Sequence, residues 1–275
     1  MPADCGSCGS YSRPRGVGRI AAALDELSGL AASRVHPGVV YAHNDSGDVP
    51  RFFALGEGAS ARGEFHVEGA TAVDWEDLAV GPCPAGSCVF LADIGDNLER
   101  RAAYAVYRVA EPALPPAGLA APLTMPADPL LFAYPDGPHN AETLLVAPGS
   151  GDLYVVTKPA RDQARVYRFP RPFTPGAPAT LRFVATLNVP ASAGRVTGGD
   201  LHPCERRLLI RTTRALHELA SPGEGSLDAL FLSTPREVPV AAERQGEAVA
   251  YRLDGRGYFT ASEGAEVELH ASVCE

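Results

Sequence analysis

Lysine is almost absent from this chain. Lys158 is the only lysine among 24 basic residues, and the rest are arginines. A GC-rich genome produces such a bias, which is the simple explanation. Lys158 is nonetheless a candidate functional residue, because a compact ammonium and a planar guanidinium are not interchangeable.

Long apolar runs and basic charge are also missing. No stretch approaches the roughly 18 apolar residues of a membrane-spanning helix, so we expect no membrane span. The formal net charge of -9 argues against a nucleic-acid partner, since a phosphate backbone requires a basic face. No Gly-x-Ser-x-Gly, P-loop or His-Glu-x-x-His motif is present either. An acidic cation-binding surface fits the charge better.

Six cysteines are present, but their spacing does not favour zinc. Only Cys5 and Cys8 have the short spacing of a zinc pair, and a zinc site of this type needs two such pairs. We therefore predict disulfides and an oxidising compartment. Cys83 and Cys88 flank an expected hairpin and are predicted to pair. Cys5 or Cys8 is expected to bond Cys274 and so join the two chain ends.

The N-terminal segment predicts a flexible arm. Residues 1–15 are polar and rich in Gly, Ser and Pro, and residues 16–275 are expected to form a single domain. Residues 1–9 contain no apolar segment of the signal-peptide type. We expect a secreted or periplasmic protein from which a signal has been removed. The alternative is a cytosolic protein with free cysteines. A monomer is expected.

A motif of small or acidic residues that runs into an apolar strand recurs five times. Aligned on the second residue of each acidic or small doublet, the copies follow one another at intervals of about 47 to 65 residues. The alignment positions are Gly29, Asp77, Glu142, Asp200 and Glu247. Five similar units of about four strands predict an all-β protein, a single β-propeller of five blades with four antiparallel strands each.

The ring is predicted to close through the N-terminus. A strand within Gly18–Leu24 would supply the outer strand of the last blade. The low-complexity segment Glu111–Pro129 is expected to be a surface insertion. The alternative of six blades requires a further blade near residues 105–140, where the pattern shows none.

Polar residues are expected to converge on one face of this propeller. The starts of the first strands and the loops after the second strands emerge there together. Carboxylates gathered in one place repel one another unless a cation neutralises them, and oxygen ligands favour calcium. The expected metal ligands are Glu76, Asp77, Glu142, Asp200, Glu247, Asp96, Asn140 and Asp45. The alternative is that these residues bond the backbone of the neighbouring blade and hold the ring together.

Basic side chains near the same face suggest an active site for a small anionic molecule. A cation polarises a substrate, basic residues neutralise its charge and a free carboxylate takes the proton. The substrate-binding candidates are Lys158, Arg211, Arg195, His43 and His139. The catalytic candidates are Asp93, Glu263, Lys158 and Arg211. Salt bridges to the carboxylates are the alternative role for Lys158 and Arg211.

The motifs resemble those of secreted bacterial β-propeller proteins described as phytase-like or esterase-like. The residues that carry the likeness are Asp74-Trp75-Glu76-Asp77, Asp93-Ile94-Gly95-Asp96-Asn97, Tyr134-Pro135-Asp136-Gly137, Asn140-Ala141-Glu142, Val196-Thr197-Gly198-Gly199-Asp200 and Gln245-Gly246-Glu247-Ala248. Glu26-Leu27-Ser28-Gly29-Leu30 is similar to the first blade of the calcium-activated nucleotidases, or apyrases. That likeness implies a calcium ion in the channel, held by Ser and Glu residues at the blade starts.

Three functions follow as hypotheses. The first is a calcium-dependent hydrolase that acts on a phosphorylated or otherwise anionic small molecule. The second is a non-catalytic binding propeller with a structural calcium ion. The third is an esterase or lactonase that uses metal-activated water on a neutral substrate.

Overall fold

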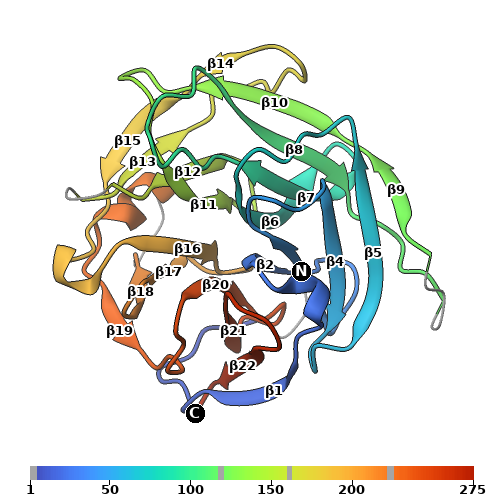
Figure 1. The fold of residues 1–275 in the computed structure, drawn as a ribbon. Coiled ribbons are helices and arrows are strands. Elements are labelled where there is room, and N and C mark those ends of the chain that lie inside the picture. Colours follow the sequence, from blue (N-terminus) through green and yellow to red (C-terminus); the bar gives the residue numbers. More distant parts are fainter. Residues whose placement is uncertain (1–4, 117–120, 160–162, 222–225) are drawn as a thin grey trace.

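The computed structural model describes residues 5–116, 121–159, 163–221 and 226–275 as an all-β protein (Figure 1). Five sheets surround a central axis, which confirms the predicted five-bladed propeller. The innermost strand of each sheet contacts the innermost strands of both neighbouring sheets, so the ring is closed. Within the described residues, no helix is long and apolar enough to cross a membrane.

Each blade is an antiparallel meander that runs outward from the axis. Blade one contains β2 (Leu27–Ala32), β3 (Val39–Asn44), β4 (Arg51–Gly56) and β5 (Ala61–Glu68). Blade two contains β6 (Trp75–Cys83), β7 (Gly86–Asp93), β8 (Tyr104–Ala110) and β10 (Asp128–Ala133). Blade three contains β11 (Ala141–Val146), β12 (Leu153–Thr157), β13 (Arg165–Arg168) and β15 (Arg182–Thr186). Blade four contains β16 (Val196–Leu201), β17 (Arg207–Thr212), β18 (Leu216–Ala220) and β19 (Arg236–Val238). Blade five contains β20 (Gly246–Tyr251), β21 (Gly257–Ser262) and β22 (Glu268–Val273).

Strands from elsewhere in the chain complete the sheets. β1 (Arg15–Arg19) pairs with β22 and closes the ring, as predicted, a few residues before the expected position. β9 (Leu123–Pro126) and β14 (Ala179–Thr180) add parallel fifth strands to blades one and two. β9 belongs to the predicted surface insertion. Three short 3-10 helices occupy loops, at Ala22–Leu24, Ala191–Ala193 and Leu227–Leu232.

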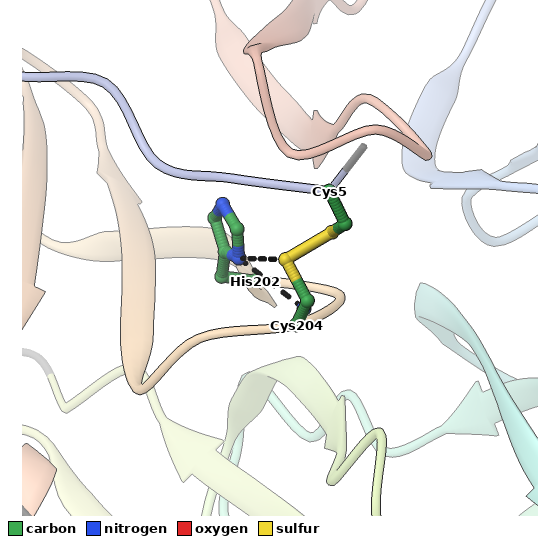
Figure 2. A group of neighbouring side chains, drawn as sticks. All are labelled: Cys5, His202 and Cys204. Atoms are coloured by element: carbon green, nitrogen blue, oxygen red, sulfur yellow. Dashed lines mark hydrogen bonds between the residues drawn. A yellow bond between two sulfur atoms is a disulfide. The ribbon is translucent and has the colours of Figure 1, made fainter. Parts of the chain in front are cut away.

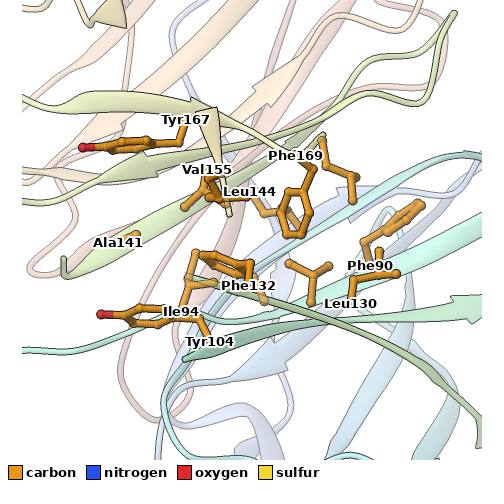
Figure 3. Close-up of a cluster of buried hydrophobic side chains, with 14 of the residues drawn as sticks. Phe90, Ile94, Tyr104, Leu130, Phe132, Ala141, Leu144, Val155, Tyr167 and Phe169 are labelled. Carbon is orange, nitrogen blue, oxygen red and sulfur yellow. The ribbon is translucent and has the colours of Figure 1, made fainter. Parts of the chain in front are cut away.

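The hydrophobic core lies between adjacent blades. Both faces of an inner strand are covered, which is why β11 and β16 are buried along their whole length. The cluster between blades two and three contains Phe90, Phe132, Leu144, Val155 and Phe169 (Figure 3). The Phe132 and Phe169 rings meet edge to face with centroids 5.0 Å apart. Each buried phenylalanine contributes about 2–3 kcal/mol of hydrophobic stabilisation.

Three disulfides are present among the described residues, and they include the predicted Cys83–Cys88 pair. Cys8 bonds Cys274, so one of the two N-terminal cysteines joins the chain ends as expected. Cys5 bonds Cys204 in blade four, a pairing that the sequence did not indicate. The segment before β1 is thus held against blades four and five, where Tyr11 is buried.

Candidate functional site

The same irregularity occurs in the innermost strand of all five blades. The pairing register between first and second strand shifts at the second position of each blade, which indicates a β-bulge. The bulged positions are Ser28, Glu76, Glu142, Thr197 and Glu247. A bulge re-aims a side chain that the regular pleat would direct elsewhere. Three glutamates and two hydroxyl residues are thereby set at equivalent points around the axis.

A second repeat fixes the loops around these positions. The residue two places before each bulge accepts a backbone hydrogen bond at its carbonyl oxygen, and the donor is the first residue after the second strand of the same blade. The five bonds are Asp45 N to Glu26 O at 2.8 Å, Ile94 N to Asp74 O at 3.1 Å, Lys158 N to Asn140 O at 2.9 Å, Thr213 N to Arg195 O at 2.9 Å and Glu263 N to Gln245 O at 2.9 Å. These backbone bonds hold the loops around one end of the channel. Because most of the residues concerned are polar, polar side chains gather there.

Seven carboxylates gather at this end, which we call the acidic mouth. They are Glu26, Asp45, Asp74, Glu76, Glu142, Glu247 and Glu263. Asp45, Asp74 and Glu76 each have one oxygen within 4.8 Å of the others. Blades one, two, three and five supply the seven groups, while blade four supplies Thr197 and Arg195.

Lys158 lies inside this cluster. Its Nζ is 2.8 Å from Oε2 of Glu142, and only 13% of the lysine side chain is exposed. Burial lowers the pKa of Lys158, but Glu142, Glu247 and other carboxylates outweigh burial and raise it. Lys158 is therefore a fixed positive charge that neutralises one carboxylate.

Four other carboxyl groups of the mouth hold protons unusually tightly. Burial, followed by the charge of Glu142, raises the pKa of Glu76 well above its usual range. Burial also raises the pKa of Asp74 to about 6 and that of Glu247 to about 7. A hydrogen bond with Glu26, and then burial, raises the pKa of Glu263 to about 7. A bound cation would stabilise the deprotonated form of these groups.

The donor set of the acidic mouth fits a hard divalent cation. Oε2 of Glu247 is buried and has no hydrogen-bond partner among the described residues. Such an oxygen is costly to leave unpaired, and a bound ion or a water molecule on that ion would satisfy it. The candidate ligands are carboxylate oxygens, as calcium, magnesium and manganese prefer. The hydroxyls of Ser28 and Thr197 already donate to Glu76 O and Gly246 O in the next blade.

Two predicted metal ligands lie elsewhere and bond the next blade instead. Asp77 accepts hydrogen bonds from Leu78 N at 2.8 Å and Leu144 N at 2.9 Å. Asp200 accepts one from Tyr251 N at 2.8 Å. Both carboxyl groups are buried, and burial raises the pKa of Asp200 to about 6. These contacts correspond to the alternative role in which polar residues hold the ring together.

Asp93, Asp96 and Asn140 hold the loop beside the mouth. Asp93 forms an ion pair with Arg101 at 2.8 Å. Asp96 accepts hydrogen bonds from Arg101 N, at 2.7 Å, and from the hydroxyl of Tyr104, at 2.9 Å. Asn140 accepts from Asp96 N at 2.7 Å, and its amide nitrogen lies 3.4 Å from Glu142 Oε1. Asn140 thus connects this loop to the acidic mouth.

Arg211 and Arg195 occupy different environments. Arg211 lies on β17, two residues before Thr213. Thr213 occupies in blade four the loop position that Lys158 occupies in blade three. Its guanidinium is buried, 3.2 Å from Glu243, and its Nε donates to Gly246 O at 3.3 Å. A Cβ at Gly246 would collide with that guanidinium, so a larger residue there would displace Arg211. Arg195 is exposed at the rim of the mouth.

The two candidate histidines lie outside the cluster. His43 is fully buried, packs edge-on against Trp75, and its Nδ1 is 2.6 Å from Asn44 O. Burial lowers its pKa to about 4, so the ring is neutral. His139 lies 3.1 Å from Asp136 and 3.1 Å from the hydroxyl of Tyr167, on the outer part of blades two and three.

Glu26 and Asp74 belong to the mouth but were not predicted as site residues. Both stand two residues before a bulge, the position that Asn140, Arg195 and Gln245 hold in the other blades. A polar residue stands two places before the bulge in all five blades, and this pattern would have identified Glu26 and Asp74. The sequence repeats were aligned on Asp77 and Asp200 instead, which hid the pattern.

No protein-family model matches the chain, and no curated protein matches its sequence. A solved structure matches its fold, that of a gluconolactonase from Xanthomonas campestris. The TM-score is 0.51 and the identity 14%, over 99% of this chain and 97% of that chain. At this identity the likeness shows the β-propeller fold. The resemblance to phytase-like proteins and apyrases stays a prediction.

Proposed function

We propose that the chain is a metal-dependent hydrolase of a neutral carboxylic ester, with a lactone as the simplest substrate. The observation that carries this proposal is the charge of the acidic mouth. Seven carboxylates face Lys158 inside the cluster and Arg195 at the rim. One divalent cation would leave the mouth near neutral or still negative. Such a mouth attracts a cation and an uncharged substrate more readily than an anion.

This charge balance weighs against the hypothesis of a phosphorylated substrate. Lys158 is already paired with Glu142, and Arg211 is buried beside Glu243. Neither ammonium nor guanidinium is free to bind a phosphate. The fold likeness to a gluconolactonase agrees with the neutral-ester proposal, although it extends only to the fold.

Asp45, Asp74 and Glu76 are the residues that would hold the cation, since their oxygens already converge. When bound, a divalent cation polarises a carbonyl group and acidifies a water molecule. Lys158 orients Glu142 at the edge of this group and favours its ionised form, against the burial that raises the pKa of Glu142. Glu247, with a pKa of about 7 and a free Oε2, can accept a proton near neutral pH. Glu263, one of the catalytic candidates predicted from the sequence, has a similar pKa but shares its proton with Glu26.

A non-catalytic propeller stabilised by a cation is the second candidate. The observation in its favour is that the carboxylates come from four different blades. An ion held by Asp45, Asp74 and Glu76 would connect blades one and two and neutralise the carboxylates of the others, whether or not chemistry follows. In this case metal would raise the melting temperature without any turnover.

The test is hydrolysis of glucono-1,5-lactone and 4-nitrophenyl acetate with calcium, manganese or zinc, compared with EDTA. We expect metal-dependent turnover of at least the lactone, and its loss in Glu76→Gln. Glu237→Gln, an exposed change on β19, is the matched control and should leave turnover unchanged. Metal-induced stabilisation with neither ester cleaved would support the binding propeller. Cleavage of 4-nitrophenyl phosphate alone would restore the phosphoester hypothesis.

The compartment that we propose is an oxidising one, outside the cytosol. Three disulfides are typical of secreted or periplasmic proteins. Calcium would also be plentiful outside the cytosol of a cell. Growth under conditions that block disulfide formation should lower the yield of folded protein.

A further inference from the structure

The end of the propeller opposite the acidic mouth carries a cavity of about 840 Å³. The turns between first and second strands of all five blades line it. Because each first strand runs from the acidic mouth to this face, the cavity lies at the far end of the axis. Its volume falls within the range of small-molecule binding sites, roughly 300–1,000 Å³.

The walls of this cavity are mostly apolar. Prolines from four blades contribute, namely Pro37, Pro82, Pro148 and Pro203, together with Leu253. Prolines hold their backbone in one conformation, so these walls need little ordering when a ligand binds.

A disulfide fixes the wall that carries Pro203. Cys204 is bonded to Cys5, and His202 lies beside that bond (Figure 2). Nε2 of His202 lies 3.1 Å from Gly255 O, and Nδ1 accepts from Cys204 N at 3.3 Å. This set of bonds joins the turns of blades four and five and gives the cavity a preformed edge.

The cavity contains one arginine without a carboxylate at bonding distance. Nη1 of Arg34 is buried and has no hydrogen-bond partner among the described residues. The other arginine in the cavity, Arg252, lies 3.1 Å from Glu57 and 3.7 Å from Asp254. The charge of Arg34 also reaches Asp200, whose pKa it lowers against the effect of burial, and Asp200 already accepts a hydrogen bond from Tyr251 N.

We propose that this cavity binds a small organic anion, an apolar body that carries one carboxylate group, with the carboxylate on Arg34. A half-buried guanidinium group at the wall of a cavity recognises a carboxylate through charge-assisted hydrogen bonds, and the proline walls accept the apolar body. Arg252 is paired with Glu57 and Asp254, so Arg34 is the arginine of the cavity that forms no ion pair among the described residues. The site is separate from the acidic mouth and does not depend on the proposed hydrolase activity.

Octanoate is a suitable probe, and octan-1-ol is its uncharged counterpart. Binding is measured by isothermal titration calorimetry in EDTA, so that no cation in the acidic mouth can attract the carboxylate. We expect octanoate to bind, octan-1-ol to bind more weakly, and Arg34→Gln to weaken octanoate binding about tenfold or more. Arg62→Gln, an exposed change on β5, removes the same charge elsewhere and should leave the affinity unchanged.

A second variant keeps the test decisive if Arg34→Gln fails to fold. Ala85 lines the cavity and is exposed, so Ala85→Trp would fill the entrance without disturbing the core. We expect it to abolish octanoate binding while leaving the melting temperature unchanged. The proposal is overturned if octanoate does not bind at millimolar concentration, or if neither Arg34→Gln nor Ala85→Trp weakens its binding.

Discussion

Lys158 Nζ lies 2.8 Å from Oε2 of Glu142, so the only lysine of the chain is paired within the acidic mouth. Lys158 follows the second strand of blade three, and Glu142 sits at the bulge of the first strand. Their pairing is therefore a product of the same backbone repeat that gathers the carboxylates. It also makes Lys158 an internal counter-ion of the proposed metal site.

Lys158→Met should change stability and cation affinity in opposite directions. The substitution leaves the buried carboxylate of Glu142 without its partner, which costs about 3 kcal/mol of unfolding free energy at pH 8 in EDTA. The same loss of positive charge should tighten calcium binding about tenfold. Denaturant unfolding and calcium titration measure the two effects.

Lys158→Arg is the matched control for this prediction, because it retains the charge. Its calcium affinity should stay close to that of the wild type. If calcium bound Lys158→Met no more tightly than wild type, Lys158 would not be a neighbour of the ion.

The metal-free protein should lose stability as the pH rises. The folded-state pKa values of Asp74, about 6, and Glu247, about 7, lie above the ordinary values of 3.8 and 4.5. Between the ordinary and the raised values the folded state binds more protons than the unfolded state, so unfolding free energy falls with pH there. The decline should begin near pH 4 and end near pH 7.

Calcium should reverse this trend, because an ion requires deprotonated ligands. Melting temperatures recorded from pH 4 to pH 8, with EDTA and with calcium, give the comparison. The stabilisation by calcium should be larger at pH 8 than at pH 5. Glu247→Gln, a neutral isostere, should flatten the decline in EDTA, and an unchanged slope would show that Glu247 does not contribute to it.

Asp77→Ala and Glu76→Gln should have opposite effects, although the two residues are adjacent. Asp77 accepts two backbone hydrogen bonds and joins blades two and three. Its loss should therefore cost about 2–3 kcal/mol of unfolding free energy and leave calcium affinity within about twofold. Glu76→Gln should abolish calcium binding without loss of stability in EDTA. Weak calcium binding by a stable Asp77→Ala protein would restore the ligand role that the sequence suggested.

The different roles of Asp77 and Glu76 show which features of the fold and the site could be predicted from the sequence. Repetition of polar residues before apolar strands was enough to predict five blades, the closing N-terminal strand and the face on which carboxylates gather. The bulge at Glu76 could not be predicted from the sequence, because it is a property of how two strands pair and does not change the pattern of polar and apolar residues. Alignment therefore centred on Asp77, which turns toward the next blade.

Contacts between residues far apart in the sequence could not be predicted either. Nothing in the sequence around Arg211 distinguishes a residue at the mouth from one buried beside Glu243, since the two meet only through folding of blades four and five. The pairing of Cys5 with Cys204 is of the same kind, because six cysteines allow many connectivities. Cys83 and Cys88 could be paired because the hairpin between them is local.

Removal of the Cys8–Cys274 disulfide should destabilise the protein more than removal of Cys83–Cys88. The first closes a loop with a sequence separation of 266 residues and the second a separation of 5. A disulfide restricts the unfolded chain more as the loop grows, and a native disulfide contributes about 2–5 kcal/mol. Cys5–Cys204 remains in place and shortens the effective loop, but that loop is still far longer than the hairpin.

Double replacement by serine, Cys8→Ser with Cys274→Ser and Cys83→Ser with Cys88→Ser, gives the matched pair of variants. Guanidinium unfolding should show the larger loss of unfolding free energy for the first pair. The contact of Tyr11 with the last blade should loosen at the same time, because β1 and β22 close the ring next to this bond. Equal losses for the two pairs would mean that the hairpin disulfide acts on the folded state, through the packing of Cys88 against the core between blades two and three.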